Sequence, residues 1–415
     1  MMSKEKRRVP KLRFPGFTED WEQRKLDDIA EIKTGGGTPK TANPEYWSGN
    51  IPWIQSSDLV EGDIVHVNIN KFINNNALKN SAAKLISRDS IALVTRVGVG
   101  KVAVINQDFT TSQDFLSLSE FNGSDIKFLA YQLYRLMQEN AKVLQGTSIK
   151  GITKTELIEQ NISIPSSGQE QNLISDVLSK IDSIITLHHR KLDNLKLKKK
   201  ALLQKLFPKN GERYPEFRFP GFTDAWEQRK LGAMCSLFTD GDWIESKDQS
   251  DEGIRLIQTG NIGVGKFIDK PENKKWISHS TFNNLRCKEL LDGDILISRL
   301  PHPAGRACII STNNEKWITA VDCTIVRLLD RYSNKFILQS LCTYNYFHLV
   351  DSFLAGGTRQ RVSRSNLSDI NIMSPEKIEQ NKIGLFFECV DNLITLHQQE
   401  PFLCGNSVNG GVELC

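Results

Sequence analysis

The chain of 415 residues is 39% hydrophobic and 25% charged, a balance typical of soluble globular proteins, and its formal net charge is only +4. A charge this small does not by itself indicate a nucleic-acid partner. Uncharged runs such as residues 91–94 are far shorter than the roughly 20 apolar residues of a membrane helix, and no apolar segment follows the charged N-terminus as in a secretory signal. We therefore expect two ordinary domain cores and a cytoplasmic location.

The most informative feature of the sequence is an internal repeat. Residues 13–26 contain Phe-Pro-Gly-Phe followed by Trp-Glu-Gln-Arg-Lys-Leu, and residues 218–231 repeat this pattern, so Trp21 and Trp226 are related by 226 − 21 = 205 positions. Self-similarity at such a period predicts two copies of one structural unit, and two units suggest a two-part target. The aromatic turn before each tryptophan is expected either to dock the chain onto a long helix or to recognise a partner.

Both copies then contain apolar strands and basic loops in the same order. Residues 54–58 match residues 257–261, and the apolar run at 90–96 matches the run at 294–299. Each of these runs ends in Arg, and a Gly followed by a Lys or Arg comes soon after it. Arg and Lys can contact guanine or phosphate and Gln can read adenine, although a solvated charged surface would have the same composition. The candidate DNA-binding residues are Thr95, Arg96, Lys101, Thr147, Ser148, Lys150, Lys154, Arg299, His302, Arg306, Thr358, Arg359, Gln360, Arg361 and Arg364.

A long helix with a coiled-coil seam is predicted after each copy, because apolar residues recur at alternating steps of four and three. The first helix spans about residues 169–206, whereas Pro401 is expected to end the second one early. We therefore expect Leu195, Leu202 and Leu206 to be exposed or paired with another subunit, and residues 401–415 to form a non-helical tail, as a frameshift or truncation would leave. The seam residues are Ile174, Leu178, Ile181, Ile185, His188, Leu192, Leu195, Ile383, Phe387, Val390, Ile394 and His397.

Several local motifs have simpler explanations than catalysis or metal binding, and no catalytic residue or metal ligand is assigned. Residues 260–266 resemble a phosphate-binding loop, but Phe267 stands where Ser or Thr would bind magnesium, so a glycine-rich hairpin is expected. Residues 43–46 depart from the Asn-Pro-Pro-Tyr signature of amino-group DNA methyltransferases and are expected to form a loop. No cysteine pair has zinc-site spacing, so buried free thiols are expected. His188 and His397 are expected in the seam.

Several short motifs combine into a more specific pattern. They are Lys-Thr-Gly-Gly-Gly-Thr-Pro at residues 33–39, Asn-Pro-Glu-Tyr-Trp at 43–47, Ile-Pro-Trp-Ile at 51–54, the twin Trp-Glu-Gln-Arg-Lys-Leu segments, and the two Glu-Gln-Asn helices that continue to Ile-Thr-Leu-His. Together they resemble the specificity subunits of type I restriction–modification enzymes. The resemblance covers about residues 10–400, and the two-copy order makes it far more specific than any single motif.

This resemblance implies a mixed α/β (α+β) chain with a pseudo-two-fold internal repeat, in which long coiled-coil helices separate two globular target-recognition domains. It implies a non-catalytic role, with each domain reading one half of a bipartite double-stranded DNA target. Adenine methylation would belong to two modification (methyltransferase) subunits and cleavage to ATP-dependent restriction subunits. S-adenosylmethionine, ATP and magnesium would bind those partners, with no cofactor in this chain and no membrane association. A stand-alone DNA methyltransferase or nuclease and a non-catalytic coiled-coil scaffold are the alternatives.

The repeat also predicts where the parts of the chain begin and end. In chain order, we expect an N-terminal segment (1–20), a first target-recognition domain (21–167), a long spacer helix (168–208), a linker that repeats the N-terminal segment (209–225), a second target-recognition domain (226–375), a shortened second spacer helix (376–400) and the tail (401–415).

Overall fold

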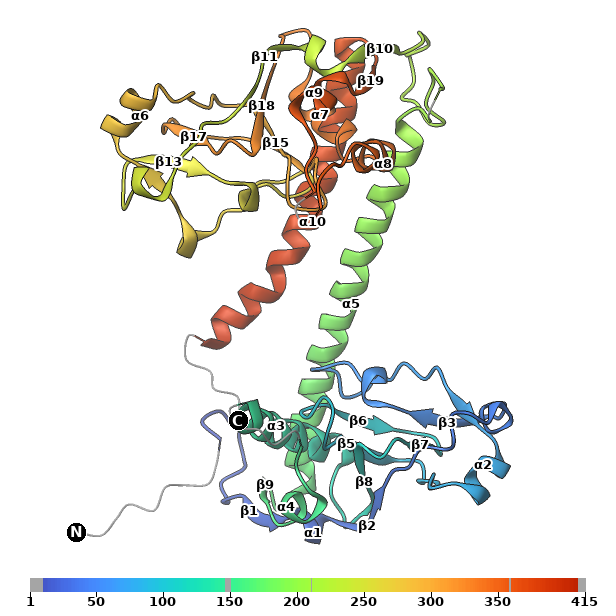
Figure 1. Ribbon diagram of the computed structural model, residues 1–415. Coiled ribbons are helices and arrows are strands. Elements are labelled where there is room, and N and C mark those ends of the chain that lie inside the picture. The colour runs from blue at the N-terminus through green and yellow to red at the C-terminus, as the bar shows by residue number, and fades with distance from the viewer. Residues whose placement is uncertain (1–9, 146–150, 210, 358–359, 410–415) are drawn as a thin grey trace, which may run out of the picture. The chain divides into compact units, whose positions relative to one another are not determined.

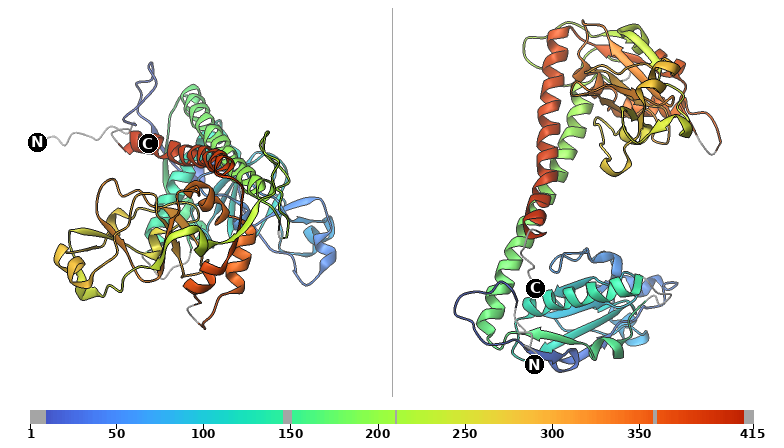
Figure 2. Two further views of the ribbon diagram at one scale, coloured as in Figure 1. Left: turned by 90° about the horizontal axis from the view of Figure 1, so that it is seen from above. Right: turned by 90° about the vertical axis from the view of Figure 1, so that its left-hand side faces the viewer.

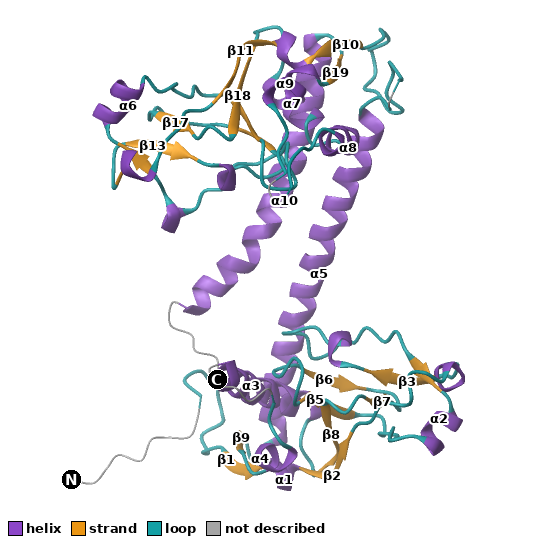
Figure 3. Ribbon diagram, viewed as in Figure 1, coloured by secondary structure: helices purple, strands orange, loops and turns teal. Residues whose placement is uncertain are grey.

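The computed structural model describes residues 10–145, 151–209, 211–357 and 360–409. The chain divides into two compact units, which we call unit 1 (Met1–His188 together with Phe402–Cys415) and unit 2 (His189–Pro401). Both contain helices and strands in similar order, which confirms the mixed α/β class and the internal repeat (Figures 1 and 3). Within the described ranges, no helix is long and apolar enough to cross a membrane.

Unit 1 is built on a four-stranded antiparallel sheet with strand order β2-β8-β5-β6. A three-stranded sheet has the order β4-β3-β7, with β3 parallel to β7 and antiparallel to β4. A separate ladder pairs β1 with β9 and so joins the start of the domain to its end. The strands are β1 Glu22–Lys25, β2 Ala30–Gly35, β3 Ile51–Ile54, β4 Phe72–Ile73, β5 Ser90–Val94, β6 Val102–Ile105, β7 Thr110–Thr111, β8 Phe115–Phe121 and β9 Asn161–Ile164.

The inner strand β5 is buried on both faces: its successive side chains point to opposite sides of the sheet, and a hydrophobic cluster covers each side. Ile91 and Leu93 join a hydrophobic cluster that includes helix α3, which packs along β5 and β6 (Figures 1 and 2). Ala92 and Val94 join a second cluster on the other face. The helices that precede α5 are α1 Leu26–Ile29, α2 Asn75–Asn80, α3 Ile126–Gln145 and α4 Lys154–Ile158, with 3-10 helices η1 Pro44–Trp47 and η2 Ser56–Asp58.

Unit 2 repeats this plan with a four-stranded antiparallel sheet of order β11-β18-β15-β16. Its second sheet has the order β12-β14-β13-β17, and the ladder β10-β19 corresponds to β1-β9. The strands are β10 Glu227–Lys230, β11 Cys235–Asp240, β12 Gln249–Ser250, β13 Ile254–Ile257, β14 Trp276–Ile277, β15 Ile295–Ser298, β16 Ala307–Ile309, β17 Trp317–Thr319, β18 Cys323–Leu328 and β19 Asn371–Ser374.

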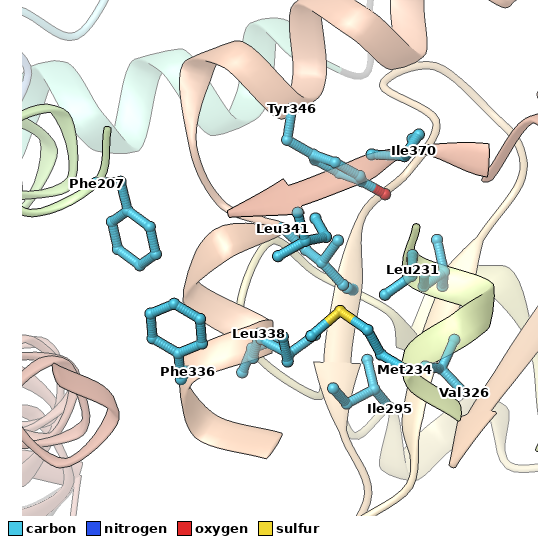
Figure 4. Close-up of a cluster of buried hydrophobic side chains, with 14 of the residues drawn as sticks. Phe207, Leu231, Met234, Ile295, Val326, Phe336, Leu338, Leu341, Tyr346 and Ile370 are labelled. Atoms are coloured by element: carbon cyan, nitrogen blue, oxygen red, sulfur yellow. The ribbon is translucent and has the colours of Figure 1, made fainter. Parts of the chain in front are cut away.

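The core of unit 2 lies between this sheet and the helices that follow it. Met234 lies near Leu231, Ile295 and Val326 in the core, and Phe336 faces Phe207 (Figure 4). The helices are α6 His279–Leu285, α7 Asn334–Ser340, α8 Tyr344–Ser352 and α9 Arg364–Asp369, with 3-10 helices η3 Leu231–Met234, η4 Ser246–Asp248, η5 Thr259–Asn261 and η6 Pro271–Asn273.

The distal end of the first long helix, α5 (Gly168–Leu206), is packed into unit 2. Leu206 is only 6% exposed, and Leu202 packs against the same core. The ring of Phe207 stacks on that of Phe336 with the centroids 5.4 Å apart. The expectation that Leu202 and Leu206 are exposed or paired with another subunit is therefore wrong, because the core of unit 2 covers them. Leu195 is half-buried.

The second long helix, α10 (Lys377–Asn409), continues past Pro401, so the expected non-helical tail is wrong for residues 401–409. Proline removes one backbone donor and crowds the preceding turn, at a cost of about 3 kcal/mol. The helical hydrogen bonds before and after the proline can still form, so a helix can continue past a proline at this cost. The remainder of the expected tail, residues 410–415, lies outside the described residues.

The predicted seam residues have different environments along the two helices. Ile174 packs against the unit 1 core, whereas Ile383 and Phe387 belong to the unit 2 core. Ile181 and Ile185 are 40% and 43% exposed. Leu178, His188, Leu192, Leu195, Val390 and Ile394 are half-buried, and His397 is buried.

Within unit 2, α5 and α10 are joined by an ion pair. The Nζ of Lys199 donates to both carboxylate oxygens of Asp391, at 2.6 and 2.9 Å. Gln339 donates a third hydrogen bond to Asp391 at 3.1 Å. The Asp391 carboxylate therefore links both long helices to α7.

Each long helix begins at a buried ion pair with the aromatic turn that precedes the domain. The guanidinium of Arg13 donates to both oxygens of Glu170 at 2.6 and 2.8 Å. Arg218 makes the same two bonds to Glu379, both at 2.8 Å. Hydrogen bonding to its glutamate raises the pKa of each arginine above its ordinary value. The Glu170 and Glu379 residues are fully buried, so the expected docking of the turns onto the helices is confirmed.

Removing one partner of such a pair is expected to be costly. Arg218→Met leaves the buried Glu379 carboxylate without a cation, so we expect the free energy of unfolding of unit 2 to fall by about 3 kcal/mol in denaturant titrations. The double variant Arg218→Met/Glu379→Leu should recover most of this loss, because no uncompensated charge is left. Arg229→Met, which removes an exposed ion pair, is the control. Equal losses of stability for Arg218→Met and Arg229→Met would show that burial of the pair does not matter.

Candidate nucleic-acid interface

In unit 1 three hydrogen bonds between main-chain groups, which we call the backbone frame, hold the loops at the end of the inner strand β5. The N–H of Val94 donates to the carbonyl of Lys101 at 3.0 Å, and the N–H of Thr95 donates to the carbonyl of Asp114 at 2.7 Å. The N–H of Ile152 donates to the carbonyl of Thr95 at 2.8 Å. The segments at Asp114 and Ile152 therefore meet at Thr95, where the turn from β5 to Lys101 begins.

Unit 2 builds the same frame at the end of β15. The N–H of Ser298 donates to Arg306 at 2.8 Å, and the N–H of Arg299 donates to Asp322 at 2.9 Å. The N–H of Val362 then donates to the carbonyl of Arg299 at 3.2 Å. These matching hydrogen bonds make the two loop clusters equivalent at the bonded residues.

The frame corrects one pairing from the sequence comparison. Thr95, and not Arg96, is the structural counterpart of Arg299, because these two residues make the equivalent backbone hydrogen bonds. The turn to the next strand is one residue longer in unit 2, since 306 − 299 = 7 whereas 101 − 95 = 6. Aligning the two runs by their terminal arginines hides this difference in length.

The glycine in each turn supports the frame. Gly100 and Gly305 have φ angles of 114° and 82°, which side chains with a Cβ rarely adopt. The carbonyl of Gly100 accepts a hydrogen bond from Gln138 at 3.1 Å, and that of Gly305 accepts one from Tyr346 at 3.0 Å. A helix of each unit therefore holds the turn through one polar side chain.

The candidate residues Lys101 and Arg306 are occupied by contacts within their units. The Nζ of Lys101 donates to the carbonyls of Ser56 and Leu59 at 3.0 and 2.8 Å. Arg306 donates to the Ser298 hydroxyl at 3.2 Å and makes a longer contact at 3.4 Å with a carbonyl of the η5 turn. Both cations hold a neighbouring 3-10 turn against the sheet, a role that sequence reasoning missed.

Arg299 is buried at the centre of a charge cluster in unit 2. Its side chain is 6% exposed, and its Nη2 lies 3.4 Å from Asp240 and 3.8 Å from Asp322. It also donates to the carbonyl of Val321 at 2.7 Å. Burial lowers the pKa of Arg299, and the nearby Arg361 lowers it further, while the two carboxylates oppose these effects.

Two exposed arginines complete this cluster, which we call the arginine cluster (Arg299, Arg361 and Arg364 with Asp240 and Asp322). The Nη2 of Arg361 lies 3.3 Å from Asp322, and its side chain is 48% exposed. The Nη1 of Arg364 lies 3.9 Å from Asp240, with 49% exposure. Three guanidiniums thus surround two carboxylates, which leaves a net charge of one cation. Sequence reasoning missed the two aspartates because they end or precede strands far from the arginines in the chain.

Unit 1 lacks three of these five charges at the equivalent positions, whereas Asp114 and Lys154 occupy the places of Asp322 and Arg364. Gly35 is the last residue of β2, as Asp240 is the last residue of β11. Gly151 directly precedes Ile152, which donates to Thr95, and Arg361 directly precedes Val362, which donates to Arg299. The counterpart of Arg299 is Thr95, a buried residue whose hydroxyl donates to the carbonyl of Asp114 at 3.0 Å. The same frame therefore presents different chemistry in the two units.

The exposed side chain of Arg96 lies beside Gly151 in unit 1. A Cβ on Gly151 would lie 2.8 Å from the carbonyl oxygen of Thr95 and 3.2 Å from the Cγ of Arg96, so a larger residue does not fit there without movement. Lys154 begins α4 as Arg364 begins α9, and its Nζ donates to the carbonyl of Lys33 at 3.2 Å.

The other candidate residues are placed only in part. His302 is exposed, with its Nδ1 4.0 Å from Asp351, and Gln360 is exposed. The remaining candidates, Thr147, Ser148, Lys150, Thr358 and Arg359, lie outside the described residues.

The glycine-rich and Asn-Pro motifs form turns. Ile262 bridges Phe267 in antiparallel fashion and Gly263 donates to Lys266 at 2.9 Å, which confirms a hairpin in place of a phosphate-binding loop. Residues 44–46 lie in the 3-10 helix η1 and not in the expected loop, and the side chain of Asn43 caps this helix by accepting a hydrogen bond from the N–H of Glu45.

Six cysteines are free thiols: Cys235, Cys287, Cys308, Cys323, Cys342 and Cys389. Burial raises the pKa of Cys308 and Cys323 to about 12. Cys389 of α10 is exposed, so the expectation of burial is wrong for this residue. Across the described ranges, no group of three or more His, Cys, Asp or Glu side chains is arranged to hold a metal ion.

A duplicated α/β unit, with a shared backbone frame that carries different side chains in each copy, defines a two-domain recognition protein. The chain belongs to the family described as the type I restriction modification DNA specificity domain, which matches residues 18–197 and 223–402. Family membership confirms the expectation from the tandem motifs: the chain is a specificity component of a type I restriction–modification system, a non-catalytic DNA-recognition protein.

The relatives include two specificity subunits from Methanocaldococcus jannaschii. That of the type I restriction enzyme MjaIX is 34% identical over 235 residues, and the match covers 53% of this chain and 52% of that relative. The chain therefore aligns with about half the length of this relative. The MjaVIII specificity subunit is 23% identical over 399 residues, covering 94% of this chain and 89% of the relative.

A solved structure supports the fold. The type I restriction–modification S subunit from M. genitalium is 16% identical, covers 94% of each chain and has a TM-score of 0.55. At this identity the likeness shows a shared fold and not a shared target.

The contacts of Lys101 predict that this residue serves stability and not DNA affinity. Lys101→Met removes two charge-assisted hydrogen bonds, so we expect the free energy of unfolding to fall by about 1–3 kcal/mol in denaturant titrations. The salt dependence of DNA binding should stay unchanged, whereas a slope that falls by about one would indicate a phosphate contact. Lys84→Met, at an exposed lysine of the same unit, is the control for both measurements.

Proposed function

We propose that the chain reads a bipartite double-stranded DNA sequence, with unit 1 reading one half and unit 2 the other, and that it directs adenine methylation or cleavage by partner subunits to that sequence. The observation that carries this proposal is the backbone frame that occurs once in each unit. A frame made by backbone groups holds its loops in the same way in both units and leaves the side chains free to differ.

The side chains on the two frames indicate that the half-sites differ. Unit 2 has Arg299 and Arg361 where unit 1 has Thr95 and Gly151. Base edges are recognised by the donors and acceptors that each side chain presents, so two frames with different side chains read different bases. The target is therefore asymmetric.

The partners proposed for this chain follow from its family. They are two modification subunits, which use S-adenosylmethionine to methylate adenine, and restriction subunits, which use ATP and magnesium. The relatives named above, which are specificity subunits of type I restriction enzymes, support this proposal. The proposed location is the cytoplasm, where the DNA target and these partners would meet.

Methylation mapping tests the proposed function. When the chain is expressed with its modification subunits in cells without other adenine methylation, we expect long-read sequencing to find methylated adenines in one motif made of two unlike halves separated by unspecified bases. Cells that carry the modification subunits alone are the control. A contiguous motif would contradict reading by two units, and the absence of any motif would contradict the proposed function.

Binding of the methyl donor separates this proposal from a stand-alone methyltransferase. We expect isothermal titration of the isolated chain with S-adenosylmethionine to show no binding, because the methyl-transfer site is proposed to lie in the modification subunit. The same titration of the assembled complex serves as the positive control. Tight binding by the isolated chain would contradict the proposed division of roles.

A further inference from the structure

We propose that Arg361 and Arg364 are specificity-determining residues that contact guanine in the half-site read by unit 2, held in place by Asp240, Asp322 and the buried Arg299. This inference rests on the proposed function and names the residues that carry it in one unit. The arginine cluster has two halves that differ in exposure, with Arg299 buried and Arg361 and Arg364 about half exposed.

The inner half of the cluster is a buried support. Arg299 is almost fully buried, with its Nη2 between Asp240 and Asp322 and a hydrogen bond to a backbone carbonyl. Its Nε is buried and has no hydrogen-bond partner among the described residues. A buried cation needs nearby negative charge, so Arg299 keeps both carboxylates at this place. The carboxylates in turn lie next to the two outer arginines.

The outer half of the cluster offers unused donors. The guanidiniums of Arg361 and Arg364 are about half exposed, at 48% and 49%, and their contacts to the carboxylates are 3.3 and 3.9 Å long. Neither side chain donates a hydrogen bond to another described residue. Each guanidinium has five donors in a planar fork, so most of this capacity is available to a ligand.

The chemistry of this arrangement favours a base edge over a phosphate. A fork that donates two parallel hydrogen bonds matches the O6 and N7 acceptors of guanine, the commonest specific contact in DNA complexes. Asp240 and Asp322 reduce the net positive charge of the site and so weaken its general attraction for phosphates, while they restrict where the forks can point. Arginine forks that are held in one orientation, in a site of low net charge, favour a particular base edge over the phosphates.

Comparison with unit 1 shows that the frame does not itself need this cluster. Thr95, Gly35 and Gly151 occupy the positions of Arg299, Asp240 and Arg361, and the backbone hydrogen bonds are the same. Arg299, Asp240 and Arg361 are therefore additions to a frame that folds without them, whereas Asp114 and Lys154 of unit 1 stand where Asp322 and Arg364 stand in unit 2. This points to a role in recognition that is particular to the half-site of unit 2.

The test selects DNA sites from a randomised library with the full chain assembled with its modification subunits. Wild-type complexes should select two unlike halves, of which one contains guanine. For Arg361→Ala/Arg364→Ala, we expect the preference for guanine at one or two positions of one half to fall by on the order of 10- to 100-fold, with the other half unchanged. Arg361→Lys/Arg364→Lys should also lose this preference, because lysine keeps the charge but lacks the fork.

The positioning role of the carboxylates has a separate readout. Asp322→Asn removes the negative charge that orients the Arg361 fork and also raises the net charge of the site, so we expect weaker preference for guanine together with tighter binding to unrelated DNA and a steeper salt dependence. A merely structural role would reduce binding to all sequences alike. Arg229→Ala, at an arginine of unit 2 that is 46% exposed and paired with Glu227, is the matched control and should change neither readout.

Several results would overturn the inference. Uniform weakening on all sequences by the alanine pair would show that Arg361 and Arg364 contact phosphates, and retained guanine preference in the lysine pair would show that the fork is not used. Selection of a half-site without guanine by unit 2 would also overturn it. Unfolding midpoints equal to wild type show that each variant is folded. Failure of the wild-type complex to select any bipartite site would instead contradict the proposed function.

Discussion

The buried arginine–glutamate pair at the start of each long helix is the interaction on which each unit depends. Glu170 and Glu379 are fully buried, so each carboxylate requires its cation, and the two hydrogen bonds from Arg13 or Arg218 permit little change in geometry. The pair joins the aromatic turn before the domain to the helix that follows it. Because the first and last strands of the domain also pair, entry and exit of the chain are held at one place.

Much of the fold could be predicted from the sequence because its strongest signals are local. Trp21 and Trp226 mark equivalent segments, and continuous apolar runs such as Ile91–Ala92–Leu93 are visible without any tertiary knowledge. The course of α10 was harder to predict. Pro401 argues locally for an end to the helix, yet the loss of one donor did not outweigh continuation to Asn409.

The sequence predicted which residue types lie in the loops of the candidate site, but not which of them support the fold and which are exposed. Lys101 is a base in the expected loop, but its two carbonyl partners come from another strand-to-turn connection, which sequence does not place beside it. Arg299 is buried because Asp240 and Asp322 converge on it from different strands. Burial of a charge depends on such distant partners, so residue type and loop position could not separate Arg299 from the exposed Arg361.

The backbone frame has a consequence for how the chain can change. Its hydrogen bonds run between main-chain groups, such as Thr95 N–H to Asp114 and Arg299 N–H to Asp322, so they survive replacement of the side chains. Replacement of an exposed side chain such as Arg361 alters what is displayed without altering how the loops are held, whereas Lys101 and Gly100 also support the frame. Each unit can therefore acquire a new preference by single substitutions at its exposed frame positions, independently of the other unit and with little effect on folding.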